Sequence, residues 1–211
     1  MPGRVHFTAV NPLLAFTPDT HKFSALQLHT PCAISWDVRD PPRKAEVVLD
    51  ATPSSSSSTS ASSSSSSSTS SGPRSLTNAE LSQHATHPPV RALRLTCGLL
   101  APDWLVVATA SSSCDGVTVG DVLMAIHDAL VQRVGQREWK QLMPKASKRI
   151  ARVFYARCGS APGEVEQARE YFGGVKRVDW LLNATAFAGL TCLESDSGEP
   201  EAVITLKKAW S

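Results

Sequence analysis

The sequence predicts an α+β fold with an antiparallel or mixed sheet and two to three helices packed on one face of that sheet. Segments with strand-like alternation occupy both ends of the chain, whereas the clearest helical periodicity lies in the middle. That order is typical of a sheet covered by helices on one side. With 211 residues, of which 42% are hydrophobic, the chain can bury one substantial core, so we expect a single domain over residues 1–211.

Strands are predicted where apolar and polar residues alternate between turn signals. Pro31, Pro41 and Pro42 interrupt the first group of these segments and exclude helix there. The predicted strands are Phe23–Leu28, Ile34–Val38, Glu46–Leu49, Leu93–Thr96, Trp104–Thr109, Arg177–Leu182, Ala186–Leu190 and Ala202–Leu206.

The strongest helical signal lies within Gly116–Arg133. We expect Thr118 to cap this helix, with Asp121 three residues later completing a capping box. Gly135 is expected to provide a left-handed exit. A second helical region covers residues 136–158 and should break at Pro144. The apolar face of the first helix comprises Val119, Val122, Leu123, Ile126, Ala129 and Leu130.

A serine tract interrupts the chain. Of the eighteen residues from Ser54 to Ser71, fifteen are serine. Such a segment has too little apolar surface to offset the entropy of ordering it. We therefore expect a disordered insertion over residues 51–87, inside one domain whose core covers about residues 5–50 and 88–208, with a short transient helix at Leu76–Ser82.

Several motifs spread along the chain resemble one known family. They are WDVRDPP at residues 36–42, GVTVGDVL at 116–123 and GVKRVDWL at 174–181, accompanied by NPLL at 11–14, ATHPP at 85–89 and FAGL at 187–190. In this order they resemble a domain family of uncharacterised function found in mushroom-forming and related fungi. The resemblance implies that residues on both sides of the serine tract belong to one fold. It carries no catalytic residue and no cofactor across to this chain.

Two sets of residues combine an aromatic ring, an acid and a base. On a strand, alternate residues share a face, so the acid and base of each set are expected to pair, or to exchange partners as Asp37–Arg177 and Asp179–Arg39 across a sheet. Either arrangement is typical of ion pairs that fix strand register. The alternative is a shallow ligand pocket lined by both tryptophans. The two sets are Trp36, Asp37 and Arg39, and Arg177, Asp179 and Trp180.

The sequence contains no motif of a known catalytic or metal site. We find no nucleophile elbow, phosphate-binding loop or dinucleotide-binding glycine pattern. His29, Cys32, His84 and His87 have spacings that zinc ligands use, but nothing in the sequence fixes the second pair. We therefore assign no catalytic residue, cofactor or metal, and an enzyme acting on a small molecule ranks third among the functions considered.

Charge is concentrated in one stretch, Arg133–Arg157, which contains eight Lys or Arg residues and one acid, Glu138. A helix with such a face can grip phosphates, so nucleic-acid or polyanion binding is the second hypothesis. The first is a non-catalytic domain that binds another protein through a groove or sheet edge near Trp36 and Trp180. The candidate polyanion-binding residues are Lys145, Lys148, Arg149 and Arg152.

Features of the whole chain suggest where it resides. No stretch approaches the roughly 18 consecutive apolar residues that cross a bilayer, and the N-terminus lacks the apolar core of a secretory signal. The five cysteines are widely spaced and odd in number, which favours reduced thiols. We therefore expect a cytoplasmic or nuclear protein without membrane contact.

Overall fold

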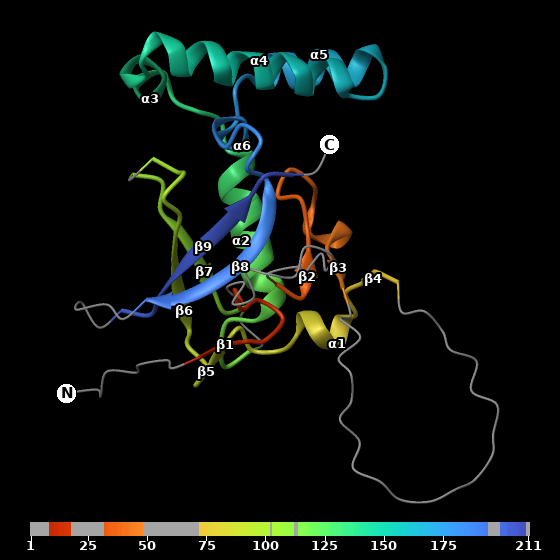
Figure 1. Ribbon diagram of the computed structural model, residues 1–211, viewed down its shortest axis with the longest axis vertical. Helices are drawn as coiled ribbons and strands as arrows, with labels where there is room; N and C mark the ends of the chain where they lie inside the picture. The colour runs from red at the N-terminus through yellow and green to blue at the C-terminus, as the bar shows by residue number, and fades with distance from the viewer. Residues whose placement is uncertain are drawn as a thin grey trace, which may run out of the picture.

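The fold centres on a four-stranded mixed sheet with strand order β7-β6-β9-β8 (Figure 1). The computed structural model describes residues 9–17, 32–48, 72–101, 103–111, 114–193 and 199–209. Strand β6 (Ala92–Thr96) pairs antiparallel with β7 (Val106–Thr109) and parallel with β9 (Glu201–Lys207), and β9 pairs antiparallel with β8 (Ala186–Leu193). The predicted α+β class and mixed sheet are confirmed.

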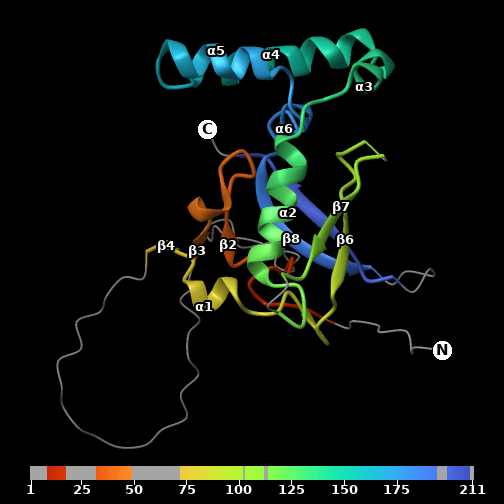
Figure 2. The ribbon, with the colours of Figure 1, turned by 180° about the vertical axis from the view of Figure 1, so that it is seen from behind.

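Helix α2 (Val119–Val131) packs along one face of this sheet (Figures 1 and 2). The predicted capping box is present, because Thr118 Oγ1 accepts from the Asp121 N–H at 3.1 Å and Asp121 Oδ2 accepts from the Thr118 N–H at 2.9 Å. The predicted apolar face is buried against the sheet, with Leu123 and Ile126 among its largest fully enclosed side chains. Local capping and the tertiary core therefore agree in this helix.

Residues on both sides of the serine tract pair with each other. Strand β3 (Glu46–Val47) lies between β2 (Ile34–Ser35) and β4 (Arg74–Ser75), after the short 3₁₀ helix η1 (Pro42–Lys44). Strand β1 (Ala9–Val10) pairs with β5 (Thr86–His87).

The expected insertion over residues 51–87 is too long at its C-terminal end. Residues 72–87 contain β4, helix α1 (Asn78–Leu81) and β5, and Thr86 is buried. Thr77 and Glu80 form a capping box for α1, and Leu81 packs against the core. The rest of the insertion, residues 51–71, and the predicted strand Phe23–Leu28 lie outside the described residues.

A group of helices lies at one end of the molecule, beyond the sheet (Figures 1 and 2). Helix α3 (Gln136–Gln141) is followed by α4 (Pro144–Ser160) and α5 (Gly163–Gly173). The break at Pro144 is confirmed, because the proline occupies the first position of α4. Helices α4 and α5 pack on each other, and α4 also packs on α6 (Arg177–Trp180), which connects this group to α2.

Two local predictions were wrong. The segment Arg177–Leu182 is not a strand, because its first four residues form α6, whose start is capped by Asp179 Oδ2 accepting from the Lys176 N–H at 2.9 Å. Gly135 does not provide a left-handed exit, since its φ is −72° and it is the N-cap of α3. Helix α2 instead ends at Val131, because its C-cap Gln132 has a ψ of 144° and the backbone is extended there.

No helix among the described residues is both long enough and apolar enough to span a lipid bilayer.

Candidate functional site

Asp37 is the centre of the first predicted set. Its Oδ1 accepts from Arg39 Nε at 2.9 Å and its Oδ2 from Arg39 Nη2 at 2.6 Å. The two residues therefore pair as predicted, but in the turn that follows β2 and not on one face of a strand, because β2 ends at Ser35. Thr185 Oγ1 also donates to Asp37 Oδ2 at 3.0 Å. Burial alone would raise the pKa of Asp37, but the Arg39 and Thr185 hydrogen bonds and the Arg39 charge hold that pKa below its ordinary value.

The neighbouring Trp36 belongs to the core. Its indole Nε1 donates to the Asp40 carbonyl at 3.0 Å, and its ring lies 6.0 Å from that of Phe187. The Phe187 N–H donates to the Trp36 carbonyl at 2.8 Å, and the Val38 N–H donates to the Thr185 carbonyl at 2.8 Å. Residues 36–38 therefore bind the outer edge of β8 at its start, and the Trp36 indole and the Asp37 carboxylate have hydrogen-bond partners within the protein.

Asp179 is the centre of the second set and is 1% exposed. Both of its oxygens accept from Arg157, with Nε and Nη2 each at 2.8 Å. Glu170 of α5 pairs with the same guanidinium and with Lys176 Nζ at 2.8 Å. Burial alone would raise the pKa of Glu170, but the Lys176 hydrogen bond and the Lys176 and Arg157 charges lower that pKa. The network holds α4, α5 and α6 together.

Two of the predicted ion-pair arrangements do not occur among the described residues: the exchange of partners between the two sets, and the Arg177–Asp179 pair within the second set. Asp179 pairs with Arg157, which the sequence placed in the basic stretch. Asp37 pairs with Arg39. Arg177 instead places its guanidinium 4.8 Å from the centre of the Trp104 ring.

Trp180 packs on Trp104, which the sequence analysis assigned to a predicted strand but not to any candidate site. The rings of Trp104 and Trp180 are 4.9 Å apart in an edge-to-face arrangement, and Trp104 Nε1 donates to Glu138 of α3. Arg177 Nε is buried without a hydrogen-bond partner among the described residues. Trp36 and Trp180 therefore pack against different aromatic partners.

The four predicted polyanion-binding residues lie on the exposed side of α4. Lys145, Lys148, Arg149 and Arg152 are all exposed, and none forms an ion pair with a described residue. Because residues four and seven apart share a helix face, Lys148, Arg152 and Tyr155 lie on one side of α4. In the structure the four predicted cations therefore form one exposed face of α4, and Tyr155, which the sequence analysis did not single out, lies next to it.

An aromatic patch that the sequence analysis missed adjoins this face. Tyr155 of α4 is 59% exposed, and Tyr171 and Phe172 of α5 are 53% and 79% exposed. The rings of Tyr155 and Tyr171 are 6.5 Å apart, and those of Tyr171 and Phe172 are 5.9 Å apart. We call these three residues the aromatic patch. Their spacing in the sequence indicates a contact only once α5 is known to fold back on α4.

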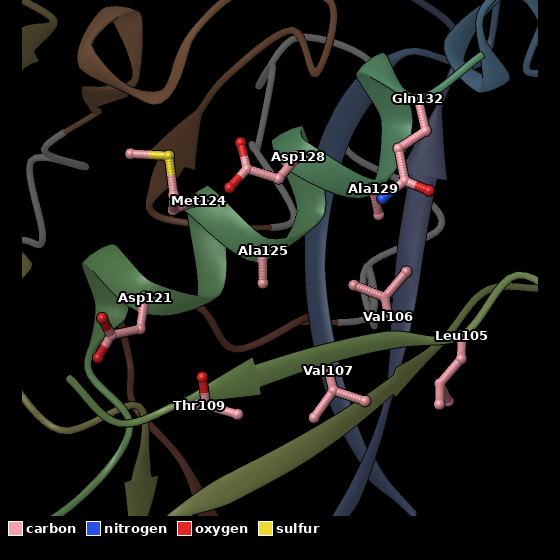
Figure 3. Close-up of a pocket in the computed structure, with 10 residues that line it drawn as sticks. All are labelled: Leu105, Val106, Val107, Thr109, Asp121, Met124, Ala125, Asp128, Ala129 and Gln132. Atoms are coloured by element: carbon pink, nitrogen blue, oxygen red, sulfur yellow. The ribbon is translucent and has the colours of Figure 1, made fainter. Parts of the chain in front are cut away.

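A groove lies between α2 and strand β7 (Figure 3). Its volume is about 370 Å³. Ala125 and Ala129 point from α2 towards β7, Val106 points back towards the helix, and Asp121 and Gln132 lie towards the two ends of the groove. The lining residues are Leu105, Val106, Val107, Thr109, Asp121, Met124, Ala125, Asp128, Ala129 and Gln132.

Three of the five thiols are poorly suited to nucleophilic chemistry. Burial raises the pKa of Cys32 to about 11, and burial also raises the pKa values of Cys97 and Cys192. In the part of the chain that the structure describes, no three His, Cys, Asp or Glu side chains gather as metal ligands would.

The model of a family of unknown function, DUF6699, matches residues 34–200, which include the motif residues at 36–42, 116–123 and 174–181. No curated protein and no solved structure matches the chain.

Proposed function

Because the chain belongs to DUF6699, a family of unknown function, we propose its role from its surfaces, as a non-catalytic domain that binds another protein. The observation that carries this proposal is the aromatic patch formed by Tyr155, Tyr171 and Phe172 on the outer part of the α4–α5 pair. Exposed rings in mutual contact leave apolar area in water that a partner would remove.

The surroundings of the patch define the partner. Tyrosine and arginine are enriched at the centres of protein interfaces, where they contribute most of the binding free energy. The exposed cations Lys148 and Arg152 share a face with Tyr155, so an acidic partner surface with apolar side chains at its centre is complementary in charge. The Arg157–Asp179 pair holds the α4–α5 pair on α6, which lowers the entropy lost on binding.

The test compares partners captured by the full chain and by two variants. The first variant carries Tyr155→Ser and Phe172→Ser, and the control carries Leu99→Ser, which removes a 46% exposed apolar side chain elsewhere. We expect quantitative mass spectrometry to show an acidic protein captured by the wild type and the control but lost from the patch variant. With that purified partner, the patch variant should bind at least about tenfold more weakly. Equal binding by all three proteins would refute the proposal.

Polyanion binding by α4 is the second candidate, favoured by the four cations that have no ion pair among described residues. A fluorescent DNA duplex would be titrated at several salt concentrations. Four phosphate contacts predict a slope of log K against log[salt] of about −3.6. Lys148→Glu combined with Arg152→Glu should lower its magnitude by about 1.8, whereas Arg91→Glu, an exposed control, should leave it unchanged. Absence of salt-dependent binding would exclude this function.

A further inference from the structure

The two edges of the main sheet differ in how they are covered. At the β8 edge, the Phe16 N–H donates to the Leu190 carbonyl at 2.8 Å and the Leu190 N–H donates to the Leu14 carbonyl at 2.7 Å. Residues 36–38 cover the start of the same strand. At the other edge, β7 pairs with β6 on one side and with no described strand on the other.

The backbone hydrogen bonds show which residues of β7 face this open edge. The Ala110 N–H donates to the Arg91 carbonyl at 2.9 Å, just beyond the paired part of the strands. Antiparallel pairs alternate between hydrogen-bonded and non-hydrogen-bonded positions, so Val106 and Ala108 bond to β6. The N–H and C=O groups of Val107 and Thr109 therefore point outward. The neighbouring strand agrees with this alternation. Arg94 is opposite Val107, and its N–H donates away from β7, to the Pro200 carbonyl at 2.9 Å.

The groove next to this edge has a definite chemistry. Asp121, Ala125, Asp128 and Gln132 recur at helical spacing along the side of α2 that lines the groove (Figure 3). The centre of the groove is apolar and is formed by Ala125 and Val106. The two acids, Asp121 and Asp128, lie two turns apart along the helix. Asp128 is exposed and has no ion pair with a described residue.

We propose that β7 and α2 together bind an extended segment of another protein, which adds to the sheet as a fifth strand and carries lysine or arginine towards α2. The backbone of Val107 and Thr109 supplies the hydrogen bonds, as in other cases of strand addition. The side chains of the segment alternate between solvent and the groove. A small apolar side chain occupies the centre, and cations on either side pair with Asp128 and with Asp121, whose Oδ2 also caps α2. This surface is separate from the aromatic patch, so the two proposals stand independently.

The probe is a labelled seven-residue peptide in which four threonines alternate with lysine, valine and lysine, with both ends blocked. Fluorescence anisotropy with the full chain should show saturable binding with a dissociation constant of about 10–500 µM. A peptide with glutamate in place of lysine should bind at least about tenfold more weakly. Failure of the lysine peptide to bind, or equal binding of both peptides, would overturn the proposal.

Two N-methylated peptides test strand addition without changing the protein. One carries methyl groups on the threonine nitrogens and the other on the lysine and valine nitrogens. Because alternate N–H groups of a paired strand face β7, one peptide should lose at least about tenfold in affinity, whereas the other should stay within about threefold of the parent. Equal loss in both would exclude strand pairing.

Protein variants locate the site. Val107→Pro removes an outward N–H, and Asp128→Lys reverses a charge on the groove, so each should weaken binding of the lysine peptide about tenfold, whereas Val107→Thr should not. If Val107→Pro fails to fold, Asp128→Lys and the methylated peptides still test the proposal.

Two other occupants of the edge are tested separately. Tighter peptide binding after deletion of residues 54–71 would show that the chain's own serine tract occupies the edge. A dimer in sedimentation that Val107→Pro abolishes would show that a second copy does. Either result would overturn the proposal of a different protein.

Discussion

Replacing Asp179 by asparagine removes the negative charge that both Arg157 nitrogens contact, with almost no change in side-chain size. The side chain of Arg157 is only 18% exposed, so its charge cannot be fully hydrated instead. Breaking a buried ion pair from one side costs about 3–5 kcal/mol. Glu170 still balances Arg157, and the amide oxygen keeps one acceptor, so we expect a loss of about 2–3 kcal/mol.

This loss should appear as a lower melting temperature and a larger hydrogen exchange rate in one region. For a chain of this length, each kcal/mol lowers the melting temperature by about 2–4 °C, which predicts a decrease of about 4–12 °C by circular dichroism. Because the ion pair joins α4 to α6, amide exchange should increase most in residues 144–173.

The control is Asp128→Asn, which removes an exposed acid without an ion pair among the described residues and should change stability by less than about 0.5 kcal/mol. A double-mutant cycle with Arg157→Gln should give a coupling free energy of about 2 kcal/mol between the two sites. If Asp179→Asn melts within about 1 °C of the wild type, the structural role of this carboxylate is refuted. A ligand-binding role would then regain support.

Three further changes test the fold. Thr118→Ala removes the capping box of α2 and should cost about 1 kcal/mol in urea unfolding. Gly189→Ala should cost more than about 2 kcal/mol, because the glycine has φ of +123° and a Cβ there would lie 2.7 Å from neighbouring backbone, whereas Gly159→Ala, with nothing within 4 Å, should be neutral or stabilising. The pKa of Asp37 is lower in the folded state, so its pairing with Arg39 stabilises the protein above the unfolded pKa of about 3.9 and loses this effect as the pH falls through the folded value. The stability difference between wild type and Asp37→Asn should therefore shrink as the pH is lowered from about 6 to below about 3; a difference that is constant with pH would contradict this.

Elements whose signals are local could be predicted from the sequence. The start of α2 depends on Thr118 and Asp121, three residues apart, and the start of α4 depends on Pro144 alone. By contrast, residues 177–182 alternate in polarity as a strand does. Their helical state depends on Asp179, whose buried carboxylate needs an arginine 22 residues earlier in the chain. When the periodicity of a short segment is ambiguous, such distant partners determine its secondary structure.

The candidate surfaces were harder to predict for the same reason. The cations of α4 are found in a sequence by counting charges, but the aromatic patch exists only because α5 folds back and places Tyr171 beside Tyr155. Likewise, the sequence identifies β7 as a strand without indicating that it lies at an edge. Its position depends on β6 pairing with β9, about a hundred residues later, where Leu95 is opposite Ala202.

Three acidic residues of the motifs form hydrogen bonds and ion pairs that stabilise the fold. Asp37 fastens residues 36–39 to the start of β8, Asp121 caps α2, and Asp179 fixes Arg157 of α4. Because each carboxylate has its hydrogen-bonding partners inside the protein, a substitution there changes stability and would lower any activity indirectly. Among the described residues, the groups that the fold does not pair are the aromatic patch, the cations of α4, the outward backbone of β7 and Asp128 beside it. Variants at these surfaces, which are expected to leave the core intact, are therefore the ones that separate function from folding.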